Sequence, residues 1–136
     1  MKVIVCLDNN GGMMFNNRRQ SKDRVLNADV LRMTERSRLC IAPFSLKLFE
    51  NSGANLVCDE NFLERAEDTD YCFVENKALA PYVDRIEELV VYYWNRFYPT
   101  DVSVDIDPHA LGFKCVSIEE FEGSSHEKIT KEIFRR

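Results

Sequence analysis

Short β-prone runs alternate with helix-like segments through the first two thirds of the chain, and this alternation restricts the fold more than any other feature. Runs rich in branched and aromatic residues are typical of buried strands, and they occupy residues 2–7, 39–42, 55–58, 71–74 and 89–94. Segments with helical spacing lie between them, at residues 22–36, 43–52, 61–66 and 77–82. Strands that alternate with helices form a mostly parallel sheet with helices on its faces, so the pattern predicts an α/β fold.

The first of these helices has the clearest start. Ser21 is the predicted N-cap, and Asp23 falls in the first turn, where a negative charge suits the helix dipole. An apolar face follows at helical spacing, formed by Val25, Leu26, Val30, Leu31 and Met33. In the second helix, Pro43 is expected at the first helical position, where its missing N–H costs nothing.

The last third of the chain changes character. Residues 102–106 alternate between apolar and polar as a strand does, residues 113–118 have strand composition, and residues 123–125 form a turn. The tail at residues 128–136 supports two interpretations. Ser124 and Glu127 have the spacing of a capping box ahead of a helix, but Ile129 and Ile133 also alternate with polar neighbours as in a strand.

The composition fits a single globular domain over residues 1–136. The chain carries 18 Lys and Arg against 23 Asp and Glu, a net charge of −5, which argues against general nucleic-acid binding because phosphate contacts need clustered positive charge. No apolar run approaches the roughly 20 residues that cross a bilayer, and the apolar stretch in MKVIVCLDNN is too short for a signal peptide. We therefore expect a cytoplasmic protein that makes no use of a membrane.

The cysteines fit neither a disulfide framework nor a zinc site. There are five of them, an odd number without close pairs: Cys6, Cys40, Cys58, Cys72 and Cys115. Each lies in a β-prone run, so we expect all of them to pack as small core residues in a reducing compartment.

Several strings, in the order in which they occur, resemble the dihydrofolate reductase family over nearly the whole chain. An N-terminal strand leads into Asp-Asn-Asn-Gly-Gly, and the strings YCFVENKALAPYVDRIEELVVYYWN, RFYPTDVSVDIDPHALGFKCVSIEEFEGS and KEIFRR follow the family's order of strands and loops. The resemblance implies a three-layer sandwich: a mostly parallel, mixed sheet of eight strands with a C-terminal antiparallel hairpin and short flanking helices. It also favours the strand interpretation of the tail.

The resemblance places the family's single pocket acid at Asp23, where a carboxylate could bind or protonate a heterocycle in an apolar cleft. The neighbouring family positions hold Arg24 in place of an aliphatic residue and Asn27 in place of a Phe. Tyr92 stands where the family has a Thr that supports its acid. The complete expected ligand-binding set is Leu7, Asp23, Arg24, Asn27, Ser45, Phe49 and Tyr92.

The family's NADPH-binding positions have changed most. Its Gly-Arg-x-Thr turn is matched by Ala42, Pro43, Phe44 and Ser45, of which only Ser45 keeps a hydroxyl. Its Gly-Gly pair is matched by Glu75 and Asn76, which place bulk and negative charge where a pyrophosphate would approach bare backbone. We therefore expect a degenerate NADPH site and no cofactor.

Two surface clusters each carry two interpretations. Arg18 and Arg19, near Lys22 and Arg24, form the only dense basic group, which is either an anion site beside the first helix or a solvated loop. The aromatic run at residues 92–98 is either core packing or a homodimer surface.

His109 and His126 lie apart from any repeated ligand spacing, so both are expected at the surface and no metal site is expected. No serine lies in a G-x-S-x-G elbow and no phosphate-binding P-loop is present, so the sequence does not predict a nucleophilic hydrolase.

The function predicted from these observations is the binding of a small molecule or a protein partner in the remaining cleft around Asp23. The alternative is a divergent NAD(P)H-dependent reductase that transfers hydride to a pterin-like or other heterocycle near the same acid. A third interpretation is an interaction module that works as a homodimer.

Overall fold

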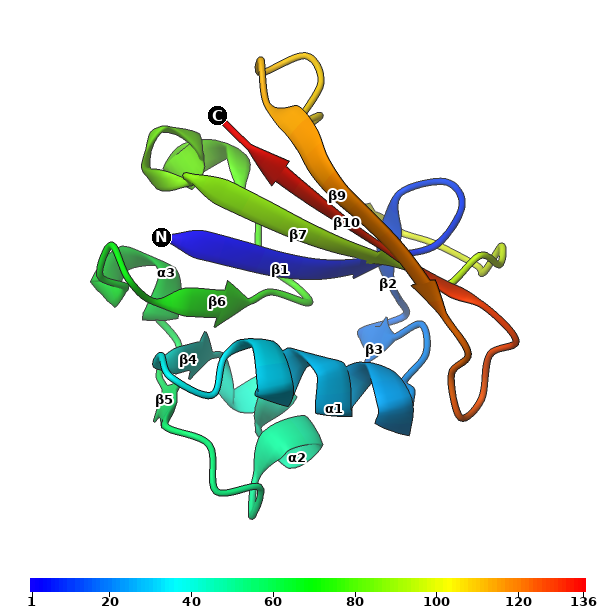
Figure 1. Ribbon diagram of the computed structural model, residues 1–136, viewed down its shortest axis with the longest axis horizontal. Coiled ribbons are helices and arrows are strands. Elements are labelled where there is room, and N and C mark those ends of the chain that lie inside the picture. The colour runs from blue at the N-terminus through cyan, green and yellow to red at the C-terminus, as the bar shows by residue number, and fades with distance from the viewer.

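The computed structural model describes all 136 residues and is built around a seven-stranded sheet (Figure 1). Five of its strands run parallel, in the spatial order β5 (Leu56–Cys58), β4 (Leu39–Ile41), β6 (Tyr71–Phe73), β1 (Lys2–Leu7) and β7 (Glu88–Tyr93). Two antiparallel strands complete it, β10 (Ile129–Arg135) beside β7 and β9 (Lys114–Phe121) at the edge. The predicted mixed sheet and C-terminal hairpin are confirmed, with seven strands in place of the expected eight.

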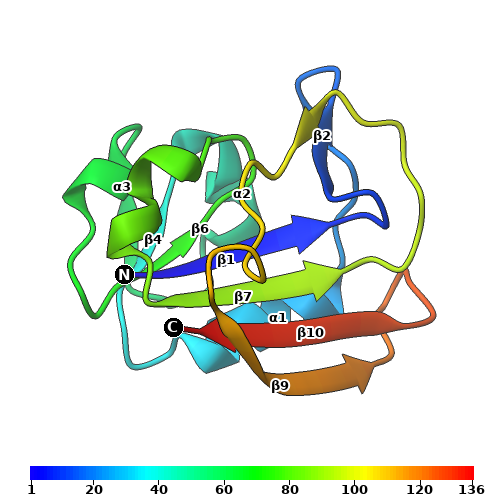
Figure 2. The ribbon, with the colours of Figure 1, turned by 90° about the horizontal axis from the view of Figure 1, so that it is seen from above.

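A second, smaller sheet stands beyond the C-terminal end of β1 (Figure 2). It consists of β3 (Arg18–Arg19), β2 (Gly12–Phe15) and β8 (Val102–Ser103), all antiparallel. Met13 and Met14 are buried and hold this sheet to the core. The strand expected at residues 102–106 is therefore only two residues long, and β2 and β3 were not predicted because their residues show no alternation.

Helices cover both faces of the main sheet, which confirms the three-layer prediction. In β1, Val3 and Val5 point into one apolar cluster and Ile4 into the other, as the two-residue period of a strand requires. The cluster of Ile4 packs against α1 (Arg24–Met33) and α2 (Leu46–Phe49). The opposite cluster packs against α3 (Phe62–Arg65) and the 3₁₀ helix η2 (Ala80–Arg85).

Two of the predicted helices differ from the structure, one in its bounds and one in its type. The first helix begins at Arg24 and ends at Met33, and its N-cap is Asp23, not Ser21. The helix expected at residues 77–82 is replaced by η2, in which the proline opens the helix as it does in the 3₁₀ turn η1 (Pro43–Ser45). The carboxylate of Asp105 accepts hydrogen bonds from the amides of Leu79 and Ala80 at the start of η2, a cap supplied from 25 residues away.

The tail is a strand, as the resemblance predicted, and it pairs on both sides with β7 and β9. The capping-box interpretation of Ser124 and Glu127 is wrong. The backbone N–H of Ser124 donates to Asp23, and its hydroxyl accepts from the backbone of Arg24, so the turn caps α1 across space and does not start a helix of its own.

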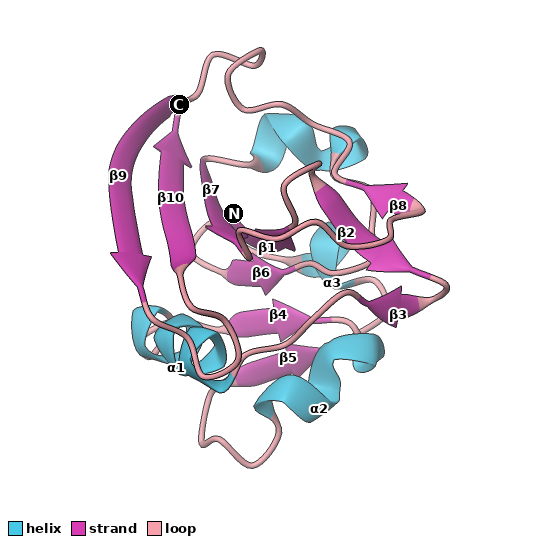
Figure 3. Cartoon of the chain, turned by 90° about the vertical axis from the view of Figure 1, so that its right-hand side faces the viewer, coloured by secondary structure: helices cyan, strands magenta, loops and turns pink.

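The aromatic strand packs in the core: Tyr92 and Trp94 share one face and Tyr93 lies on the other. Cys40 and Cys72 are buried and Cys6 is half-buried, but the prediction of core packing is wrong for Cys58 and Cys115. These two are exposed because β5 and β9 are the edges of the sheet (Figure 3). None of the helices is long and apolar enough to cross a membrane.

Candidate functional site

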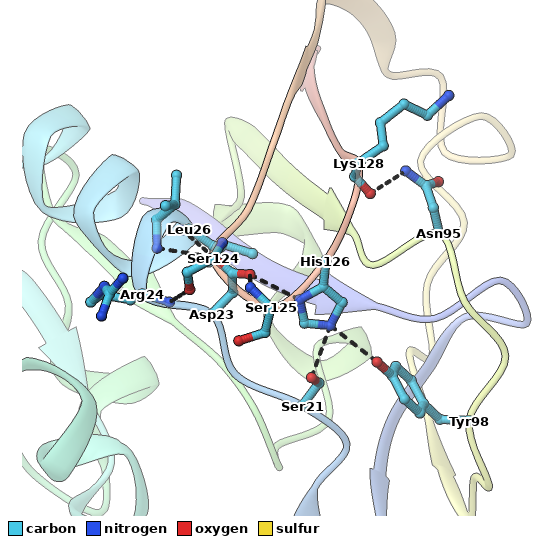
Figure 4. A network of polar contacts seen from close by, with 11 residues as sticks. Ser21, Asp23, Arg24, Leu26, Asn95, Tyr98, Ser124, Ser125, His126 and Lys128 are labelled. Atoms are coloured by element: carbon cyan, nitrogen blue, oxygen red, sulfur yellow. Dashed lines mark hydrogen bonds and ion pairs between the residues drawn. The ribbon is translucent and has the colours of Figure 1, made fainter.

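A buried histidine is at the centre of a network of polar contacts between the start of α1 and the turn before β10 (Figure 4). The expectation that His126 is a surface residue is wrong: its side chain is 2% exposed. Its Nδ1 lies 2.9 Å from Oδ2 of Asp23, and its Nε2 lies 3.0 Å from both Ser21 Oγ and Tyr98 Oη. The ring stacks on the indole of Trp94 with 4.5 Å between ring centroids, so packing and hydrogen bonds together hold its plane.

The Asp23 carboxylate joins the start of α1 to the turn before β10. Oδ1 accepts hydrogen bonds from the amides of Val25 and Leu26, the pattern of an N-cap, and a third from the amide of Ser124. Oδ2 accepts from the amide of Ser125 and from His126. Both oxygens are thus fully used within the protein, and neither is free to bind a ligand.

The charge of this carboxylate is fixed by the same contacts. Burial acts to raise the pKa of Asp23, but the hydrogen bonds from His126 and from the backbone amides of Ser124, Ser125 and Leu26 outweigh it and hold that pKa well below its ordinary value. An ionised Asp23 can only accept a hydrogen bond, so the proton in this contact lies on Nδ1 of His126. Nε2, the other ring nitrogen, faces the hydroxyls of Ser21 and Tyr98.

Gly123 is needed where the turn passes over this carboxylate. A Cβ at this position would overlap Oδ2 of Asp23 and lie 2.8 Å from Cδ1 of Ile129. The close approach allows the next two amides to reach the carboxylate, and only glycine permits it.

On the side where the resemblance places the NADPH phosphates, Arg19 turns inward. Its Nε and Nη2 donate to the two oxygens of Glu75 at 2.8 and 3.0 Å, and its guanidinium lies over the Phe44 ring at 4.8 Å. Ser45 is buried and donates to the same Glu75 at 2.7 Å. Of the other three residues expected here, Ala42 is buried, and Pro43 and Asn76 are exposed. A bidentate ion pair therefore lies at the ends of β4 and β6.

The interior of the cleft is nearly filled. The cavity bordered by Arg19, Ser21, Asn27, Glu75 and Trp94 has a volume of about 20 Å³, the space of a single water molecule. An aromatic heterocycle does not fit there without movement of these side chains.

A larger hollow opens on the outer side of the same segment. This basic groove has a volume of about 570 Å³ and is lined by Asn17, Arg18, Arg19, Ser21, Lys22 and Phe44. Arg19 is paired with Glu75, whereas Arg18 and Lys22 have no acidic partner. The sequence left the basic cluster as either an anion site or a solvated loop. In the structure, Arg19 is ordered by its partners, whereas Arg18 faces solvent.

The expected ligand-binding residues do not form one site. Asn27 borders the small cavity, and Arg24 is exposed beside Asp23. Phe49 is buried against Phe73 on the face covered by α1 and α2, and Leu7 belongs to the apolar cluster on the opposite face.

Tyr92 supports a different acid from the one the resemblance implies. Its hydroxyl donates to Asp29 at 2.6 Å, and the same oxygen of Asp29 accepts from Lys131 at 2.9 Å. Burial, followed by the bond to Asp29, raises the pKa of Tyr92 well above its ordinary value. This buried cluster joins α1 to β7 and β10 and was not predicted.

The sequence analysis missed Ser21, Tyr98 and His126 as members of one site because 105 residues separate the first from the last. The sequence signal that could have indicated this site was the hydrophilic turn at residues 123–125. If the tail is a strand of the sheet, this turn lies beside the start of the first helix. His109 is exposed, as expected, and lies edge-on against Phe134. No group of three or more His, Cys, Asp or Glu side chains is arranged to hold a metal ion.

No protein-family model and no curated protein matches the sequence. Among solved structures, the chain is similar to dihydrofolate reductase from Enterococcus faecalis complexed with NADP(H) and RAB-propyl. The similarity has a TM-score of 0.69, covers 99% of this chain and 95% of that one, and comes with 9% sequence identity. At this identity the likeness is one of backbone architecture, and the chain has the dihydrofolate-reductase-like fold that its strings of residues predicted.

Proposed function

We propose that the protein binds a small anionic molecule in the basic groove and does so without a pyridine dinucleotide. The observation that carries this proposal is the ion pair between Arg19 and Glu75. It fills the place at the ends of β4 and β6 with protein side chains, and it leaves Arg18 and Lys22 as the unpaired cations of the groove.

The energetics of the ion pair oppose a dinucleotide phosphate at this place. A phosphate there would have to displace Arg19 from Glu75 and leave that carboxylate, which is 10% exposed, beside a second negative charge. Breaking a buried, bidentate charge pair costs about 3–5 kcal/mol. The Enterococcus faecalis protein is complexed with NADP(H), and we infer that this ability does not extend to the present chain.

The groove has the chemistry of an anion site. Arg18 and Lys22 supply charge, Asn17 and Ser21 supply hydrogen-bonding groups, and the aromatic ring of Phe44 forms one wall. In a chain of net charge −5, a groove with two unpaired cations selects small anions over the polyanions that the rest of the surface repels.

The test is a thermal-shift titration with inorganic pyrophosphate, succinate and NADPH. We expect pyrophosphate or succinate to stabilise the protein, by about 2.7 kcal/mol at a concentration a hundredfold above its dissociation constant. The double variant R18A/K22A should lose this effect. The matched control K47A removes an exposed lysine on α2 and should retain it.

NADPH carries phosphates of its own, so its binding is judged against the double variant. If NADPH stabilises R18A/K22A as strongly as the unchanged protein, it binds outside the groove, and the dinucleotide-free proposal is wrong. If none of the three anions stabilises the protein, the proposal that the basic groove binds anions is wrong.

A further inference from the structure

We infer that Ser21 is a nucleophile, with His126 as its general base and Asp23 as the group that orients the base, and that the groove hydrolyses small esters bearing an anionic group. This inference depends on the proposed function for the charge of the substrate. The nucleophile itself rests on geometry independent of that proposal.

The three side chains form a continuous chain of hydrogen bonds, from Ser21 Oγ to Nε2 of His126 at 3.0 Å and from Nδ1 to Oδ2 of Asp23 at 2.9 Å. A hydroxyl in contact with an imidazole whose other nitrogen contacts a carboxylate is the arrangement that activates serine for acyl transfer. This arrangement is recognised by geometry and not by order along the chain. The absence of a G-x-S-x-G elbow therefore does not argue against it.

The orientation of the ring favours proton transfer in the required direction. Asp23 is held ionised by its amide donors and accepts a hydrogen bond from Nδ1, so Nε2 is the ring nitrogen that faces the hydroxyl of Ser21. As His126 takes a proton from Ser21, the carboxylate 2.9 Å from Nδ1 stabilises the imidazolium that forms.

The array is fixed in place before any substrate arrives. Arg19 is held by Glu75 on one side of the serine, and Gln20 is held by Thr100 at 2.7 Å. Asp23 is held on the other side as the N-cap of α1. Ser21 and Lys22 therefore lie in a short bridge between fixed neighbours, and a preorganised nucleophile avoids the entropic cost of positioning it.

The nucleophile is accessible and its base is protected. Ser21 is half-buried and borders the basic groove, whereas the His126 side chain is 2% exposed and is covered by Trp94. A substrate can thus reach the hydroxyl without solvent reaching the imidazole. The positions of Arg18 and Lys22 in the groove suit an ester whose acid portion carries a carboxylate or phosphate.

Hydrogen-bond donors beside the serine can stabilise the negative charge that develops on the carbonyl oxygen of the substrate. The backbone N–H of Lys22 makes no hydrogen bond within the protein, so it is free to donate, as is the ammonium group on the same residue. Removing one such donor from an acyl-transfer site typically slows the reaction about 100- to 1000-fold.

The reaction balances without a cofactor. Ser21 Oγ attacks the ester carbonyl carbon and gives its proton to Nε2; the C–O bond to the alcohol breaks, and the alcohol leaves with that proton. Water then attacks the acyl-serine and gives a proton to Nε2, the bond between the acyl carbon and Oγ breaks, and Oγ takes the proton back. The net result is one ester and one water converted to one acid and one alcohol.

Tyr98 separates this chemistry from a purely structural role. Its hydroxyl lies 3.0 Å from the same Nε2, so it competes with Ser21 for the base. If the array only clamps the turn to α1, Y98F and S21A are equivalent losses of one hydrogen bond. If Ser21 is the nucleophile, S21A removes the reaction, whereas Y98F leaves Nε2 its contact with Ser21 and changes the rate without removing the reaction.

The experiment combines covalent labelling with hydrolysis by the full chain. A fluorophosphonate probe should add to the protein, intact mass and peptide mapping should place the adduct on Ser21, and mono-4-nitrophenyl glutarate should be hydrolysed faster than 4-nitrophenyl acetate. We expect S21A to lose the adduct and H126Q to slow both reactions about a hundredfold or more. S37A, a half-buried serine elsewhere, should react normally.

The outcomes separate this inference from the proposed function. No adduct on the folded, unchanged protein, or an adduct on Cys58, Cys115 or a lysine, overturns the nucleophile and leaves anion binding to its own test. An adduct on Ser21 with equal hydrolysis of the two esters, unchanged in R18A/K22A, supports the nucleophile and overturns the anionic substrate.

Discussion

Two buried aspartates on the same helix have opposite kinds of partner. Asp23 caps the start of α1 and is bound mainly by backbone amides, whereas Asp29 lies six residues later and is bound by the side chains of Tyr92, Lys131 and Arg32. In both, burial acts to raise the pKa and hydrogen bonds outweigh it, so both carboxylates have a pKa below the ordinary value.

The difference lies in where each network ends. The partners of Asp29 belong to α1, β7 and β10, so its contacts tie the helix to the sheet and lead to no groove. The contacts of Asp23 continue through His126 to Ser21 at the edge of the basic groove. Two buried, ionised aspartates therefore need not have equal roles; what distinguishes the site from the support is that its network ends at a hydroxyl that borders a groove.

Acid should affect both aspartates together and produce the largest loss of stability. Their folded pKa values lie below the unfolded value of about 3.9, so their stabilisation is complete above about pH 4 and is lost as the pH falls through the folded values. We expect the free energy of unfolding, measured by urea titration, to be level from pH 7 to 5 and to fall steeply below pH 4.

The variants D23N and D29N measure how much each carboxylate contributes to the loss of stability in acid. Each should lower stability at pH 7 and flatten the fall in acid, because the group that takes up the proton is gone. A variant whose acid profile remains parallel to that of the unchanged protein would show that its carboxylate does not contribute to the fall.

Removing Asp29 should have the largest effect of any single change. In D29A the Lys131 ammonium, 11% exposed, loses its carboxylate, and the buried Tyr92 hydroxyl loses its acceptor. Leaving a buried charge unpaired costs about 3–5 kcal/mol, which urea unfolding measures directly. The labelling of Ser21 at a temperature where D29A is folded should be unchanged, and its loss would erase the distinction between the two aspartates.

The fold could be predicted from the sequence because its signals are local or belong to a resemblance that spans the chain. Each strand of the parallel core is a dense β-prone run, and the tail was resolved by its resemblance alone. The exposed cysteines on β5 and β9 were predicted wrongly because strand order, and so which strands are edges, is decided by pairings far apart in sequence.

In the network around His126, only Asp23 could be predicted from the sequence, and there for a different reason. The resemblance indicated an acid at the start of the first helix, but not that its oxygens are consumed by residues 124–126. Contacts across about 100 residues leave no local periodicity. Similarly, Glu75 was predicted as a lone repulsive charge, and nothing in the sequence indicates that Arg19, 56 residues away, neutralises it.

Removing Asp23 should cost less stability than removing Asp29 but more function. D23A loses an N-cap, worth about 1 kcal/mol, and leaves the amides of Ser124 and Ser125 without an acceptor. We therefore expect the free energy of unfolding to fall by about 2–4 kcal/mol. Water can reach part of the exposed turn, which limits the cost. Ser21 labelling should fall at least tenfold, because the imidazole loses its orienting partner. Stability lost without a change in labelling would reduce Asp23 to a helix cap.

The smallest effect should come from Arg32, which contacts Asp29 at 2.6 Å, as closely as Tyr92 does, and yet is 69% exposed. Water solvates its guanidinium equally well in the unfolded chain, and the i, i+3 pair pays side-chain entropy to form, so R32A should cost less than about 0.5 kcal/mol. The matched change K131A removes a cation that contacts the same carboxylate from a site only 11% exposed, and it should cost several times more. Urea unfolding of both variants at low and high salt checks this order, and the effect of R32A should vanish in high salt. If R32A proved as costly as K131A, exposure would not govern the strength of these contacts. The larger stability loss expected for D29A than for D23A, which depends on the burial of Lys131, would then have to be abandoned.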